Sequence, residues 1–503
     1  MTGPMVPAPS AIRSPVAVGL AAGAAGLLAQ WLFVDTGVGI NVPIAIAALL
    51  ISGWLVRPAT HRLPRARDAW LPLAAIGLSA FAALRGDATL VTLDLLGAVA
   101  LTGAALASFG GFAVVDRPFG SIAELASRVL GSAAVAGSRV IRGLIAVIPG
   151  SGARKSVTRA APILRGLLIA LPLVLLFVAL FAAADAVFAR IARDLFKDLD
   201  IDLGSLPARI LVAAAAAWLV AGLLHFVAAS DRVDEEGPPP AAVSTLRRLG
   251  STEAATVLIV LDLLFAGFVA LQAAYLFGGQ DTVQASGLTY AEYARRGFFE
   301  LLAVALIVGS LILAAEYLVV RRTPAYLATA IGLVGLTAVV LVSALLRLRL
   351  YQEAYGWTEL RFYVLAAILW LAIGCLFAVV SLATNRSRWL LHGMLALSIV
   401  FGIAFNLIGP VRLIAEQNLA RAIDPELVAP GGETAVDVWY LNLLGDDAVL
   451  PLAEALPDLP PDLRHEVTEI LRNRAYDLEH SPGNESWQAW NLSREAARAR
   501  LLR

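Results

Sequence analysis

Cysteine and charge are what this sequence has least of. Cys375 is the only cysteine among 503 residues, which excludes an intramolecular disulfide and a metal site built from several cysteines. Charged residues make up 16% of the chain, and the formal net charge is +0. A nucleic-acid-binding protein carries clustered basic charge, so this balance predicts no nucleic-acid partner.

Apolar residues are correspondingly abundant. They make up 59% of the chain, and the mean hydropathy is +0.76. A soluble domain is about a quarter charged and about half apolar. The composition therefore predicts an all-α fold, a polytopic transmembrane helix bundle whose partner is the lipid bilayer.

Long apolar runs set the expected number of spans. A helix needs roughly 20 apolar residues to cross a hydrocarbon core of ~30 Å. About eleven runs come close to this length, although two of them are short. They are Pro15–Val34, Ile40–Val56, Trp70–Leu84, Thr89–Val115, Ile163–Ala184, Pro207–Ala229, Ala254–Phe277, Gly297–Val320, Pro324–Leu346, Leu360–Ala383 and Trp389–Val411.

The loop charges indicate an orientation. Lys and Arg concentrate in the connections at 57–67, 117–159 and 232–248, which all lie on one side of an eleven-span chain. Because such residues are retained in the cytoplasm, we expect a cytoplasmic N-terminus in a multi-pass protein of the inner (plasma) membrane. Eleven spans place the C-terminal tail outside, and one miscounted helix would reverse that.

Changes in composition divide the chain into six regions. We expect N-terminal transmembrane helices, an interfacial cytoplasmic segment, a transmembrane helix pair, a Pro-rich cytoplasmic linker, C-terminal transmembrane helices and a soluble helical tail. Their ranges are 1–116, 117–162, 163–230, 231–253, 254–411 and 412–503, in that order.

Two of these regions are amphipathic. Ser121–Val147 gathers apolar residues near one face together with arginines, which predicts a helix on anionic headgroups or one packed on the bundle. In the tail, Asp437–Leu444, Ala448–Leu456 and Asp462–Ala475 read as short helices resembling one HEAT-type hairpin. One such unit cannot bury its own face, so it docks on a partner or lies on the membrane or the bundle.

Motifs of soluble enzymes are missing. The five histidines show no His-x-x-x-His spacing and have no cysteine partners, so we expect no metal site. The segment Pro149–Ser156 imitates a phosphate-binding loop but has Arg154 where the motif needs glycine. We therefore expect no cofactor and no catalytic residue set.

Polar side chains inside spans are costly and need a reason. Asp262 lies well inside its predicted helix, Gln272 lies further along the same helix, and Asn406 lies in the last span. They are candidates for an intramembrane proton or ion relay. The alternative is an ordinary interhelical hydrogen bond, which holds many membrane bundles together.

The outer ends of the later spans hold the densest mixture of charge and aromatic rings. If these ends converge, they form a polar cup able to bind an anionic ligand or lipid headgroup through arginines. The alternative is an aromatic belt with interfacial ion pairs. The candidate cup residues are Asp185, Arg295, Arg296, Glu300, Tyr355, Thr358 and Arg361.

Several of these stretches together resemble a known family. The similar segments are Leu180–Phe188, Tyr290–Leu301, Tyr355–Thr358 with Arg361, Asn418–Arg421, Tyr440–Val449 and Trp490–Arg494. The chain resembles the bacterial polytopic membrane family catalogued as domain of unknown function 4173, with its broader 4153 relative, from about Ile163 onward. Ala186 stands where the family pattern has proline. The resemblance implies a fold and domain limits, and it assigns no activity.

Three functions fit these patterns. The first is a non-enzymatic envelope sensor or scaffold, whose cup and tail contact an anionic lipid or an envelope protein. The second is a secondary transporter with Asp262 in its relay. The third is a membrane enzyme acting on lipid-linked substrates, for which no nucleophile or metal-ligand spacing is present.

Overall fold

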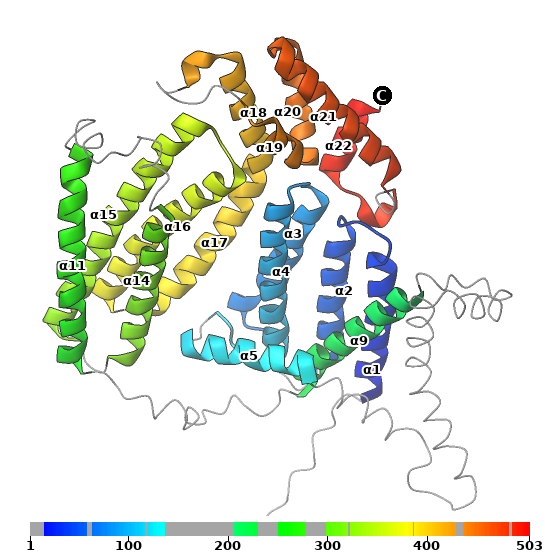
Figure 1. Cartoon of the computed structure of the whole chain (residues 1–503). Coiled ribbons are helices and arrows are strands. Elements are labelled where there is room, and N and C mark those ends of the chain that lie inside the picture. Colours follow the sequence, from blue (N-terminus) through cyan, green and yellow to red (C-terminus); the bar gives the residue numbers. More distant parts are fainter. Residues whose placement is uncertain are drawn as a thin grey trace, which may run out of the picture. The chain divides into compact units, whose positions relative to one another are not determined.

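The structure is a computed structural model. It describes residues 15–57, 63–115, 119–135, 206–229, 250–277, 298–319, 322–385, 387–428, 436–481 and 485–502. The elements in these ranges are α-helices and short 3-10 helices, with no β-strand among them (Figure 1). The all-α prediction is confirmed for this part of the chain.

Six helices in the described ranges are long and apolar enough to cross a membrane. A seventh span is added if residues 392–408 and 410–423, bent by 50° at their junction, count as one. The protein is therefore a multi-pass membrane protein. The six helices are α1 (Pro15–Phe33), α4 (Ala88–Phe109), α9 (Leu206–Ala229), α11 (Ser251–Phe277), α15 (Pro324–Tyr355) and α16 (Glu359–Thr384).

Most of the other predicted spans also coincide with helices. Shorter or broken apolar helices occupy four of these runs. They are α2 (Asn41–Val56), α3 (Leu71–Ala80) followed by η2 (Phe81–Ala83), α14 (Phe298–Leu318) and α17 (Ser387–Ile408). The predicted span Ile163–Ala184 lies outside the described residues. The count of eleven stays a prediction.

The chain divides into two compact units. Unit 1 comprises residues 1–84, 94–236 and 481–491, and unit 2 comprises residues 85–93, 237–480 and 492–503. In unit 1, α1 packs on α9 through small residues that let the backbones approach closely. A Cβ on Gly26 would meet the Ala213 carbonyl oxygen at 2.4 Å.

The start of the predicted amphipathic segment is the helix α5 (Phe119–Val135) of unit 1. Its buried residues Leu125 and Val129 belong to a small core with Phe112, and the Ser132 hydroxyl donates to the Gly222 carbonyl of α9 at 2.8 Å. Leu130 is 69% exposed. One face of α5 thus packs on the bundle, and an apolar side chain remains outside it.

Unit 2 contains a bundle of α11, α14, α15, α16 and α17. Thr323 caps α15, its hydroxyl accepting from the Tyr326 amide at 3.3 Å, and Pro324 occupies the first turn, where its missing N–H costs nothing. Tyr326, Leu333 and Leu382 are among the buried side chains that join the helices. Exposed leucines such as Leu376 face outward, as lipid contact requires.

The C-terminal tail of unit 2 follows α17 at a bend. Gly409 has a positive φ of 66°, and Pro410 opens the next helix. Its helices are α18 (Pro410–Ile423), α19 (Val438–Leu443), α20 (Val449–Ala455), α21 (Pro461–His480) and α22 (Leu492–Leu501). The three predicted tail helices therefore exist, α21 running further than expected, whereas the HEAT-type resemblance stays a prediction.

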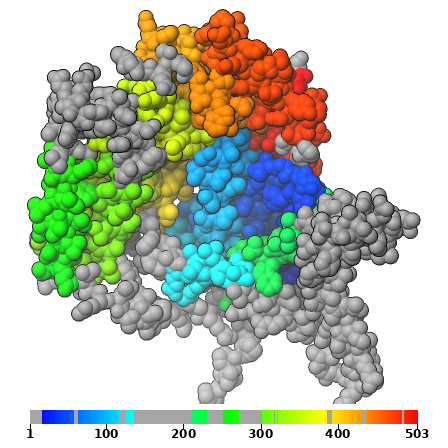
Figure 2. Space-filling model, viewed as in Figure 1, coloured from blue at the N-terminus to red at the C-terminus, as the bar shows by residue number. Residues whose placement is uncertain are grey.

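The tail is packed on the helices of its own unit. Its core includes Ile414, Leu441, Leu452 and Val467, together with Phe362 from the first turns of α16. Figure 2 shows the orange tail residues against the yellow-green bundle residues of the same unit. The tail thus buries its apolar face within the same chain.

Candidate functional site

The turn between α15 and α16 depends on a glycine that ends the first helix and a threonine that caps the second. Gly356 ends α15 with φ +75°, a conformation that a Cβ disfavours. Thr358 caps α16 by accepting from the Arg361 amide at 3.3 Å. A Cβ on Gly356 would also lie 2.7 Å from Asn418 Oδ1, so the tail approaches the turn closely.

Asn418 of α18 fixes this turn from the tail side. Its Oδ1 accepts from the Trp357 amide and its Nδ2 donates to the Trp357 carbonyl, each at 2.8 Å. The two bonds reproduce the pairing of a β-ladder with a side chain in place of a strand. They hold α18 in one register against the start of α16.

Two arginines complete the end of α15. Arg421 Nη1 donates to the Glu353 carbonyl at 2.8 Å, and Arg361 Nη1 donates to the Gly356 carbonyl at 2.6 Å. Arg361 also lies over the Tyr351 ring, 4.1 Å from its centroid. The last carbonyls of a helix have no partner within it and carry partial negative charge, so they hold both guanidinium groups in place through some of their N–H groups.

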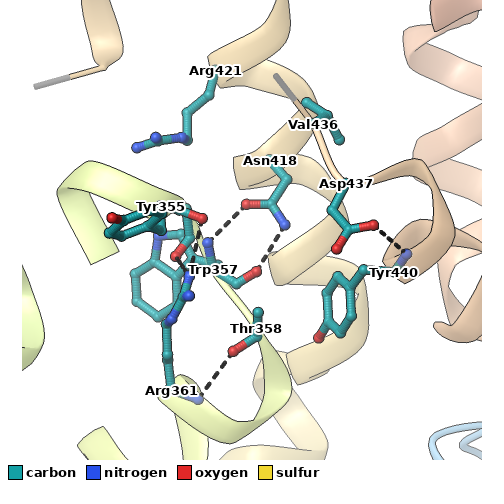
Figure 3. A pocket seen from close by; sticks show the side chains of 10 residues that line it. Tyr355, Trp357, Thr358, Arg361, Asn418, Arg421, Val436, Asp437 and Tyr440 are labelled. Carbon is teal, nitrogen blue, oxygen red and sulfur yellow. Dashed lines mark hydrogen bonds between the residues drawn. The ribbon is translucent and has the colours of Figure 1, made fainter. Parts of the chain in front are cut away.

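These side chains enclose a pocket of about 180 Å³. In Figure 3, Arg361, Arg421 and Tyr355 lie on one side of the Asn418–Trp357 pair, and Asp437 and Tyr440 lie on the other. The lining residues are Tyr355, Gly356, Trp357, Thr358, Arg361, Asn418, Arg421, Val436, Asp437 and Tyr440. We call it the turn pocket.

Tyr440 connects the turn pocket to a buried acidic region. Its hydroxyl oxygen accepts from the Glu359 amide at 2.6 Å, and burial raises the pKa of Tyr440 to about 12. Next to it, Asp87 is 3% exposed and accepts from the Leu90 amide at 3.0 Å. Burial raises the pKa of Asp87 above its ordinary value, and the charge of Asp447 adds to this.

The adjacent aspartates Asp446 and Asp447 hold the tail together. Asp446 is 8% exposed and accepts from Arg474 Nε at 2.8 Å, with Arg494 Nε at 3.7 Å. Asp447 accepts from the Gly86 amide at 2.7 Å and from the Ser493 hydroxyl at 2.6 Å. Burial lowers the pKa of Arg494, which the Asp446 charge partly opposes. These bonds are structural ties between distant parts of the sequence.

Three of the seven predicted cup residues have described side chains, and these three belong to one turn of the chain. Tyr355, Thr358 and Arg361 line the turn pocket. Asp185, Arg295 and Arg296 lie outside the described residues, and so does the side chain of Glu300 at the start of α14. Convergence of the whole cup stays a prediction.

The predicted relay is described at two of its three positions. Asp262 of α11 lies against α15, where a Cβ on Gly332 would be 3.4 Å from Asp262 Oδ2. Asp262 Oδ1 is buried and has no hydrogen-bond partner among the described residues. Asn406 Nδ2 donates to the Gly402 carbonyl of its own helix at 2.9 Å, and the side chain of Gln272 is not described.

Seven of the ten pocket residues were not among the sequence candidates. Among these seven, Asn418, Arg421 and Asp437 come from the tail, and nothing in its polar composition distinguishes them. Asn418 and Arg421 do stand in one of the segments that carry the family resemblance, which was the available signal. Among the described residues, no group of three or more His, Cys, Asp or Glu is placed to hold a metal ion.

The fold and this site define an all-helical, multi-pass membrane protein whose C-terminal tail is fixed to the ends of two of its own helices. The model of the family described as a domain of unknown function (DUF4153) matches residues 72–455, and the chain belongs to this family. The match includes every residue of the turn pocket and ends in α20. Neither the curated proteins nor the solved structures gave a match.

Proposed function

We propose that this protein is a non-enzymatic sensor or scaffold of the bacterial inner (plasma) membrane, and that its turn pocket binds an anionic ligand. The observation that carries the proposal is the presence of Arg361 and Arg421 in one pocket, each held in place by carbonyls at the end of α15. Guanidinium groups oriented in advance bind phosphate or carboxylate without losing further side-chain freedom.

The use of the tail residues supports a scaffold. The side chains of Asn418, Asp446 and Asp447 bond to backbone amides, arginines and a serine of the same unit. A catalytic group has to be available to a substrate instead. Such a tail is a rigid platform attached to the membrane helices.

The proposed orientation places this platform outside the cytoplasm. In unit 2 the tail packs on the turn that joins α15 and α16. In the eleven-span topology that turn is an outer connection and the N-terminus is cytoplasmic. A cysteine introduced at the exposed Trp439 and labelled in intact cells tests this orientation.

Retention of an anionic lipid by the purified full-length protein tests the proposed function. Arg421→Gln removes one pocket cation, and Arg412→Gln is the matched control, because Arg412 is on the same helix but pairs with Glu416 outside the pocket. We expect Arg421→Gln to retain about tenfold less phosphatidylglycerol than either the wild type or the control. Equal retention by all three proteins would overturn the proposal.

A transporter is the second candidate, and Asp262 is the observation in its favour. A buried carboxyl oxygen without a hydrogen-bond partner in the described residues is costly inside a membrane span, and relays use such groups. Asp262→Asn should abolish proton flux in proteoliposomes, whereas Glu253→Gln in the first turn of the same helix should leave it unchanged. Flux that is absent in the wild type, or unchanged in Asp262→Asn, would exclude this relay.

A further inference from the structure

The turn pocket is lined by two arginines, Arg361 and Arg421, and by one carboxylate, Asp437. This lining suits a ligand that carries both a negative and a positive charge. We propose that the pocket binds an aminoethyl phosphate group, the headgroup of phosphatidylethanolamine, with its phosphate on the arginine wall and its ammonium on the Asp437 wall. This inference rests on the proposed function and names the ligand class of the same site.

The arginine wall fits a phosphate that carries one negative charge. Arg361 and Arg421 donate to backbone carbonyls through some of their N–H groups, and Arg361 Nε and Nη2 make no hydrogen bond to the residues that the structure describes. These groups can donate to phosphate oxygens without breaking the bonds that hold the turn. A phosphate also offsets the repulsion between two guanidinium groups in one small pocket.

The opposite wall fits a primary ammonium. Asp437 is exposed, and its Oδ1 accepts from the Tyr440 amide at 2.9 Å. Its Oδ2 makes no hydrogen bond within the described part of the chain and is available to a ligand. The Trp357 and Tyr440 rings also line the pocket, and aromatic faces attract cations.

The two walls exclude simpler ligands. A ligand with negative charge alone would place part of that charge near Asp437, and a cation alone would meet two arginines. A zwitterion satisfies both walls when its charges are separated in the same order as those of the pocket. Charge complementarity of this kind determines which ligand is selected.

Size and depth agree with a headgroup. The pocket volume of about 180 Å³ is below the ~300–1,000 Å³ of sites for drug-sized ligands.

The 26 residues of α16 extend about 39 Å, longer than a hydrocarbon core of ~30 Å. The first turn of α16, with Arg361 beside the 59% exposed Leu360, therefore lies near the headgroup layer.

Asp437→Asn is the decisive variant. Asparagine caps a helix about as well as aspartate, so α19 keeps its N-cap and loses only the charge. Asp424→Asn is the matched control, because Asp424 also caps a helix, accepting from the Glu426 amide at 3.0 Å, and does not line the pocket. Thermal unfolding of both variants verifies that they fold.

The experiment measures lipid retention by the full-length protein in phosphatidylcholine nanodiscs doped with phosphatidylethanolamine or phosphatidylglycerol. We expect the wild type and Asp424→Asn to prefer phosphatidylethanolamine. We expect Asp437→Asn to bind that lipid about tenfold more weakly and phosphatidylglycerol no more weakly than the wild type does.

The other outcomes are distinct. Preference for phosphatidylglycerol in the wild type, or an Asp437→Asn variant unchanged for both lipids, overturns the inference while the proposed anion site stands. If neither lipid is retained, or if Arg421→Gln retains them as well as the wild type does, both the inference and the proposed anion site are overturned. If the protein binds soluble phosphoethanolamine but neither lipid, the aminoethyl phosphate group is still the ligand, and the inference that it comes from a membrane lipid is overturned.

Discussion

The side-chain amide of Asn418 pairs with the backbone of Trp357 in both directions, at 2.8 Å for each hydrogen bond. Asn418 is 9% exposed, so water does not replace these bonds when they are lost. The relationship joins the turn after α15 to the first tail helix, 61 residues further along the chain. It makes the shape of the turn pocket dependent on attachment of the tail.

Asn418→Asp tests this attachment. The variant keeps the size of the side chain, but a carboxylate oxygen then faces the Trp357 carbonyl where a donor had been. We expect a loss of about 1–3 kcal/mol in stability, the cost of an unsatisfied buried polar group. Faster proteolysis within the tail measures the loss. Asn442→Asp, at an exposed position of α19, should match the wild type, and equal sensitivity of the two variants would contradict the assignment.

Gly356→Ala tests the close approach at the same turn. The new Cβ requires a strained positive φ and would lie 2.7 Å from Asn418 Oδ1. We expect a destabilisation of about 1–3 kcal/mol, seen as a lower melting temperature in detergent. Gly335→Ala in α15 is the control, because no atom lies within 4 Å of its Cβ position. A Gly356→Ala protein as stable as this control would show that the turn tolerates a side chain.

Asp446→Asn tests the ion cluster of the tail. Arg474 and Arg494 would lose their shared partner, and Arg494 is substantially buried. We expect the tail to lose about 3 kcal/mol, because breaking a buried ion pair by removing one partner costs more than breaking a surface pair. Glu469→Gln removes the partner of Arg472 in an exposed pair and should change stability by no more than about 0.5 kcal/mol. Hydrogen exchange of α21 and α22 separates the two results.

Asp87→Asn tests the buried carboxyl. Because burial raises the pKa of Asp87, the folded protein holds this proton to higher pH than the unfolded chain does. The stabilisation is complete below the unfolded-state pKa of about 3.9 and is lost as pH rises through the raised pKa. Glu359, Tyr363 and Asp447 face the same carboxyl, and Asn keeps the oxygen that caps Leu90.

The measurement for Asp87 is the melting temperature as a function of pH. We expect the melting temperature of the variant to rise relative to that of the wild type as pH increases from about 4 toward neutrality. At lower pH the two melting temperatures should come closer together. Asp424→Asn, which removes a carboxyl at an exposed N-cap, should show no such trend. A difference between Asp87→Asn and the wild type that stays constant with pH would contradict a titrating Asp87.

Local sequence chemistry predicted the helices well and the site only in part. Each apolar run from Pro15 to Val411 that the structure describes contains a helix, because backbone groups in lipid must be satisfied within the helix. Tyr355, Thr358 and Arg361 were identified because they stand together at one span end. Their partners Asn418 and Asp437 are common polar residues in a polar tail, and periodicity does not distinguish them.

Asp446 and Asp447 show the same limit. Both aspartates stand just before the predicted tail helix Ala448–Leu456, and that position does not indicate their partners. In the structure Asp446 binds two arginines, and Asp447 binds Gly86, 361 residues away. Spacing along the chain says nothing about such pairs, since only folding brings the side chains within hydrogen-bond distance.

The scarcity of charge and the long apolar runs by themselves determined that this protein crosses a membrane as helices, because a long apolar chain needs lipid as its solvent. The tertiary structure alone decided which of its few charges meet. Arg361 and Arg421 lie together because both donate to carbonyls at the end of α15, and Asp437 lines the same pocket because Asn418 holds the tail in one register. The pocket is a product of those long-range hydrogen bonds.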